Sequence, residues 1–85
     1  MPVISRFLGI VIAMYWNDQS PPHFHAKYGE FEVKVYLDDG LVEGTFPRRS
    51  LKHVLEWYEL HREELLVNWQ LCEQRQNPNP IEPLE

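Results

Sequence analysis

The residues most capable of chemistry are two histidines that lie two positions apart. His23 and His25 flank Phe24, and Lys27 follows after one further residue. In an extended strand, side chains two positions apart project from the same face, so both imidazoles can reach one substrate or one ion. Imidazoles can divide general acid and base roles near neutral pH, while Lys27 and Lys34 supply charge for a phosphate. The spacing therefore makes His23, His25 and Lys27 candidate catalytic residues for chemistry of the ribonuclease kind.

Two other interpretations of this histidine pair stay open. A metal ion needs a third ligand, and the alternation of the segment puts no further ligand on the same face, so we predict no metal site and only weak metal binding. Alternatively, both histidines are structural and hydrogen-bond to the backbone or to Glu32 across neighbouring strands. The sequence leaves open whether the chain is an enzyme, and it predicts no cofactor.

Charged residues in the second half of the chain form another candidate group. Arg48 and Arg49 follow Pro47 at the expected first turn of a helix, where cations oppose the helix dipole. Their position favours an anion or an acidic partner, with a solvated arginine pair as the alternative. His61 joins them as a binding candidate because Glu64 lies on the same helical flank, with a packed or capped histidine as the favoured alternative. The strand histidines should point away from this helix, so the two groups are not expected to form one site.

Hydrophobic patterns predict the elements that position these residues. An apolar run and three alternating segments, separated by turn signals, predict strands over residues 7–16, 23–28, 30–37 and 41–46. From residue 48 to 76 the apolar period is helical, and its stripe should cover one face of the sheet. Arg62 interrupts that stripe, so one long helix and two shorter ones both fit. The predicted fold is α+β: an antiparallel meander of three to four strands packed on one face by a C-terminal helical segment.

A second apolar line lies on the helical segment opposite the core stripe. A helix with only one buried face would not carry such a line, so it predicts a protein interface. A break in the helix would turn part of the line into the core instead. The predicted interface residues are Trp57, Leu60, Val67 and Leu71.

Length, charge and cysteine content narrow the class of protein. The 85 residues predict a single domain over 1–76 with an extended, proline-rich tail over 77–85. The net charge of −5 disfavours a protein whose affinity comes from many phosphate contacts. A lone cysteine, Cys72, is typical of a reducing compartment, and no apolar stretch suggests a signal peptide or a membrane span. We therefore expect a cytoplasmic protein.

Three segments taken in order resemble the small prokaryotic proteins of the DUF4160 family. They read SRFLGIVIAMYWND, PPHFHAKYGE and FPRRSLKHVLEWYELHREELLVNW and cover nearly the whole chain. The positions that match the family pattern are Pro22, His23, Phe24, His25, Ala26, Tyr28, Gly29, Glu30, Arg49, Trp57, His61, Glu64 and Asn68.

The resemblance implies a stress-linked role. Members of this family are commonly encoded beside a DUF2442 protein, a pairing interpreted as a toxin–antitoxin module. The leading expectation is a cytoplasmic toxin–antitoxin component that acts through protein association, with RNA as a candidate target. Its partner would be a DUF2442-type, antitoxin-like protein or a second copy of the chain, and no membrane is involved. The alternatives are a non-catalytic interaction or regulatory module with structural histidines, and a weak metal-binding protein.

Overall fold

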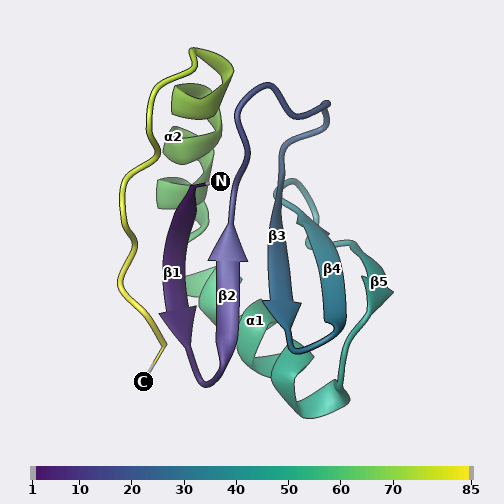
Figure 1. Ribbon diagram of the computed structural model, residues 1–85. Coiled ribbons are helices and arrows are strands. Elements are labelled where there is room, and N and C mark those ends of the chain that lie inside the picture. The colour runs from purple at the N-terminus through teal and green to yellow at the C-terminus, as the bar shows by residue number, and fades with distance from the viewer. Residues whose placement is uncertain (1, 85) are drawn as a thin grey trace.

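Five strands form one antiparallel sheet, and two helices cover one of its faces (Figure 1). The computed structural model describes residues 2–84. The strands lie side by side in chain order: β1 (Val3–Phe7), β2 (Ile10–Ala13), β3 (His23–Tyr28), β4 (Phe31–Tyr36) and β5 (Val42–Thr45). The predicted α+β class and the antiparallel meander are confirmed, whereas the expected three to four strands are too few.

The extra strand comes from a turn inside the apolar run that was predicted as one strand over 7–16. Leu8 and Gly9 both have positive φ, 51° and 78°, which is the backbone of a tight hairpin turn between twisted strands. The chain reverses there, so β1 and β2 pair with each other. Because leucine seldom occupies such a turn, the run of apolar residues concealed it.

The helical segment is two helices, α1 (Arg48–Leu60) and α2 (Arg62–Glu73). His61, with φ −121°, ends the first and precedes the second, so the break lies where Arg62 interrupts the apolar stripe. Each helix can therefore turn its own face to the sheet. The core between the layers includes Phe24 and Val35 from the sheet and Val54, Trp57, Tyr58, Leu65 and Trp69 from the helices.

Trp57 corrects the predicted interface line. Its side chain is fully buried, with ring centroids 5.5 Å from Phe7 and 5.6 Å from Phe24. The indole N–H donates a hydrogen bond of 2.9 Å to the carbonyl oxygen of Glu82. Because α1 ends at the break, the apolar face of α1 does not have to line up with that of α2. Helix α1 therefore packs with Trp57 facing the sheet.

The C-terminal tail is extended, as predicted, but it packs along β1 (Figure 1). The N–H of Ile81 donates to the carbonyl oxygen of Ile4 at 2.8 Å, and the Ile81 side chain is buried. The side-chain amide of Asn68 holds the backbone of Asn79 through hydrogen bonds of 2.9 and 2.8 Å. The tail therefore shields the β1 edge of the sheet. In the part of the chain described here, neither helix is long and apolar enough to cross a membrane.

Candidate functional site

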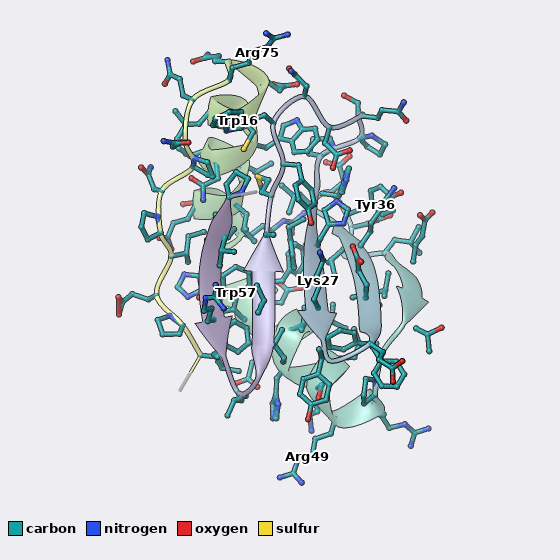
Figure 2. The ribbon with its side chains drawn as sticks, in the orientation of Figure 1. Trp16, Lys27, Tyr36, Arg49, Trp57 and Arg75 are labelled. Carbon is teal, nitrogen blue, oxygen red and sulfur yellow. The ribbon has the colours of Figure 1, made fainter. Side chains whose placement is uncertain are left out.

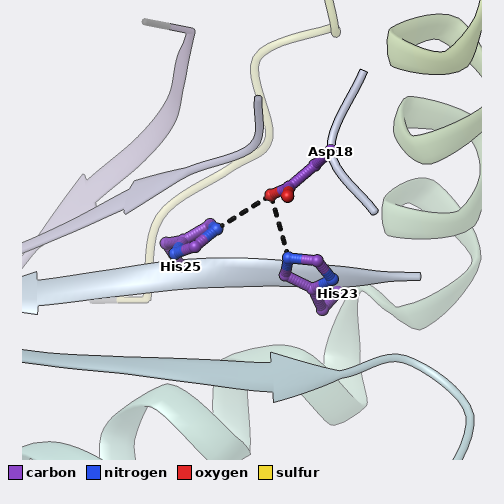
Figure 3. Close-up of side chains that lie close together, drawn as sticks. All are labelled: Asp18, His23 and His25. Carbon is purple, nitrogen blue, oxygen red and sulfur yellow. Dashed lines mark hydrogen bonds and ion pairs between the residues drawn. The ribbon is translucent and has the colours of Figure 1, made fainter. Parts of the chain in front are cut away.

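Three side chains meet at the start of β3 and form what we call the histidine–aspartate cluster (Figure 3). The Nε2 atoms of His23 and His25 lie 2.9 and 3.0 Å from the same carboxylate oxygen, Oδ2 of Asp18. One candidate ligand atom from each of the three residues falls within 4.8 Å of the other two. Two imidazoles and one carboxylate thus converge on a single point.

The β2–β3 loop and the strand period build this convergence. His23 and His25 alternate along β3 with Phe24 and Ala26, which are fully buried in the core. Phe24 and Ala26 thus lie on the core face as predicted, whereas Tyr28 is exposed. The prediction that both histidines point away from the helices is wrong for His23, whose ring packs against Trp69 of α2. The loop that joins β2 to β3 carries Asp18, and through it the carboxylate comes back over the histidine face.

The two histidines differ in burial. His23 is 2% exposed, because its ring packs against Trp69 and Tyr36 with centroid separations of 5.3 and 5.6 Å. The side chain of His25 is 12% exposed and meets the Tyr15 ring edge-on at 4.6 Å. Aromatic neighbours on both rings restrict their rotation, so the two imidazoles are held in place.

Each ring also faces an oxygen acceptor on its far side. Nδ1 of His23 lies 2.8 Å from the carbonyl oxygen of Pro21, which can only accept a hydrogen bond. Nδ1 of His25 lies 3.2 Å from Oε2 of Glu32, again an acceptor when ionised. Both nitrogens of each ring therefore face acceptors, and a neutral ring can donate to only one of them at a time.

The cluster also changes the acidity of Asp18. Burial raises the pKa of this carboxyl group, but opposing effects outweigh burial. Hydrogen bonds from His25, the backbone N–H of Gln19 and His23, together with the positive potential of His23, hold the pKa of Asp18 below its ordinary value. The carboxylate is therefore an ionised acceptor at neutral pH.

Asp18 corrects the prediction that no third ligand lies near the histidine pair. That prediction considered only residues on the same strand face, whereas the carboxylate comes from the preceding loop. The signal in the sequence was an acidic residue shortly before His23 in the polar segment that leads into the strand. Its position depended on the path of the loop, which local patterns do not predict.

The predicted acid–base pair fits the structure less well. A proton donor must come within hydrogen-bond reach of its substrate, and His23 is too deeply buried to touch a phosphodiester. Lys27 lies further along the strand than His25. The pKa of Lys27 is raised, mainly by its hydrogen bond with Tyr15 and then by the charges of Tyr15 and Glu32. Lys27 is therefore already engaged with neighbouring side chains.

The predicted anion-binding residues do not join the cluster. Arg48 and Arg49 are exposed at the start of α1, and Arg49 lies at the end of the molecule opposite Trp16 (Figure 2). His61 sits at the break between the helices, where its Nδ1 lies 2.6 Å from Oε1 of Glu64 and its ring centroid lies 5.4 Å from that of Trp57. The arginine pair and His61 thus lie at opposite ends of α1, and neither belongs to the cluster.

The remaining predicted interface residues lie on the helices. Leu60 is 66% exposed and Val67 is 50% exposed, while Leu71 is half-buried. Leu60 lines a hollow of about 450 Å³ together with Leu8 from the β1–β2 turn and Leu84 from the tail. We call the region around Leu60, Val67 and these two leucines the helix–tail surface.

The fold and the site define a small α+β protein with a histidine–aspartate cluster at the start of β3. The family model described as "Domain of unknown function (DUF4160)" matches residues 9–70, which include the cluster and most of both helices. The chain therefore belongs to the DUF4160 family, as its motifs predicted. No curated protein and no solved structure matches it.

Proposed function

We propose that the protein acts by binding a partner protein through the helix–tail surface, as a cytoplasmic component of the toxin–antitoxin type. The observation that supports this proposal best is the exposure of Leu60 and Val67 on adjoining hollows. Large apolar side chains that remain exposed together on a small domain are typical of interaction sites. The proposal agrees with the association that the family resemblance implies.

The hollows form one continuous region. The hollow beside Leu8 and Leu84 shares Leu60 with a second hollow at the helix break. The second shares Glu64 with a third, which Val67 lines together with the tail residue Ile81. A partner helix or extended segment could therefore contact α1, α2 and the tail at once.

The charges on this surface suggest the chemistry of the partner. Four carboxylates line the hollows against a single arginine, Arg62; they are Glu56, Glu59, Glu63 and Glu64. Together with the net charge of −5, they favour a partner that presents apolar anchors flanked by basic residues. The same acidic surface disfavours RNA as the target. A DUF2442-type protein, the partner that the family resemblance implies, is the one to test first.

Co-purification with the protein encoded by the neighbouring gene tests the proposal. Leu60→Asp and Val67→Asp should each weaken the complex by at least about tenfold, because they place a charge among apolar anchors. Leu41→Asp is the matched control, since Leu41 is also largely exposed but lies in the β4–β5 turn, outside the hollows. Sedimentation of the chain alone measures self-association. A complex that withstands both helix variants, or that Leu41→Asp disrupts equally, would contradict the proposed surface.

A further inference from the structure

The geometry points to a binding site for one divalent transition-metal ion, formed by Asp18, His23 and His25. The site is independent of the helix–tail surface, so either proposal can fail without the other. Both Nε2 atoms lie within 3.0 Å of Oδ2 of Asp18, which places three potential ligand atoms around one point. Three atoms so close together suit one small ion held between them.

The hydrogen-bond acceptors on the far side of the rings suit an ion at that point. Each Nδ1 faces an oxygen acceptor, the carbonyl of Pro21 or the carboxylate of Glu32. When an ion replaces the protons between Nε2 and Asp18, each ring can keep its remaining proton on Nδ1 and donate it to that acceptor. Both Nε2 lone pairs and the Asp18 oxygen are then free to bind the ion. A histidine that donates through Nδ1 to a carbonyl or carboxylate and binds through Nε2 is the usual arrangement at metal centres.

The distances are close to those of a metal centre. Ligands bound about 2.0 to 2.2 Å from a tetrahedral zinc ion are separated from one another by roughly 3.3 to 3.6 Å. The Asp18 oxygen already lies 2.9 and 3.0 Å from the two nitrogens, so the carboxylate needs to withdraw by only a few tenths of an ångström. Because Asp18 is on a loop, it can make that movement while both histidines stay fixed on β3.

The ligand types identify the class of ion. Two imidazoles and one carboxylate suit zinc, iron(II), cobalt or nickel, whereas calcium and magnesium prefer oxygen ligands and copper(I) prefers sulfur. Three protein ligands leave at least one position for water or an exogenous ligand, which is the pattern of reactive rather than purely structural zinc sites.

A titration of the metal-free protein with Zn²⁺ tests the site. We expect one zinc ion per chain. Loss of an outer-shell partner typically weakens metal binding by roughly 10- to 100-fold. Asp18→Asn and His25→Ala each remove a direct ligand, so each should weaken zinc binding by more than that. Both residues are partly exposed, so these variants should fold, which far-ultraviolet circular dichroism can verify.

His61→Ala is the matched control, because His61 also contacts a carboxylate, Glu64, but lies outside the cluster. Its zinc affinity should stay within about twofold of the wild type. The proposal is overturned if the folded wild type binds no zinc, or if the affinity is unchanged in both Asp18→Asn and His25→Ala.

Discussion

The chain places histidine beside carboxylate in two regions, and these regions differ in convergence and burial. In the histidine–aspartate cluster, two imidazoles meet one oxygen of Asp18, and His23 is almost completely buried. At the helix break, His61 meets Glu64 alone, at 2.6 Å, and the carboxylate is exposed to solvent. The first arrangement can hold an ion, whereas the second is an i,i+3 contact on a helix surface.

The difference shows what the secondary structure contributes. A strand places residues two apart on one side, so a neighbouring loop can bring a third group to both of them. The i,i+3 pair at the helix break brings together only one imidazole and one carboxylate. Similar residue types therefore produce a potential metal centre in one region and a local ion pair in the other.

The largest expected contrast is in stability. His23→Ala should lower the free energy of unfolding by about 2 to 4 kcal/mol, because it leaves a cavity between Trp69 and Tyr36. His61→Ala should cost less than about 1 kcal/mol, since that side chain borders solvent. Urea unfolding of the metal-free proteins measures both values. Equal losses in the two variants would break the comparison.

An intermediate contrast concerns the acceptors that orient the rings. Glu32→Gln should weaken zinc binding by about 10- to 100-fold, because the amide holds the Nδ1 proton of His25 less strongly than the carboxylate does. Glu64→Gln should leave zinc affinity unchanged. Competition with a chromophoric chelator measures both dissociation constants. A similar affinity in the Glu32 variant and the wild type would show that Glu32 does not support the site.

The smallest expected effect belongs to the ion pair at the helix break. Glu64→Gln should change the free energy of unfolding by no more than about 0.5 kcal/mol, because the pair is exposed and screened by water. Urea unfolding with and without added salt measures this change. A loss above about 1 kcal/mol would show that the pair fixes the angle between α1 and α2.

Local patterns predicted most of the sheet and the placement of both histidines on one face of a strand, but not the packing of His23 against α2. The alternation from His23 to Tyr28 was sufficient because the strand period alone decides which side chains share a face. The Leu8–Gly9 turn escaped prediction because both of its flanks are apolar, so nothing in the hydrophobic pattern marks the reversal.

The errors at the site have a tertiary origin. Asp18 reaches the histidines through a loop, and no periodic pattern specifies the path of a loop. The orientation of Trp57 depended on whether the helix breaks at His61, which the sequence left open. In both cases the missing information was how neighbouring elements pack, which one segment cannot contain.

X-ray absorption spectroscopy of the zinc-loaded wild type tests the central claim most directly. The spectrum should show two imidazole ligands and additional oxygen ligands at about 2.0 to 2.2 Å, and the imidazole contribution should fall to one in His25→Ala. A zinc ion bound without two imidazoles, or a spectrum that the His25 variant leaves unaltered, would contradict the assignment of the cluster as a metal centre.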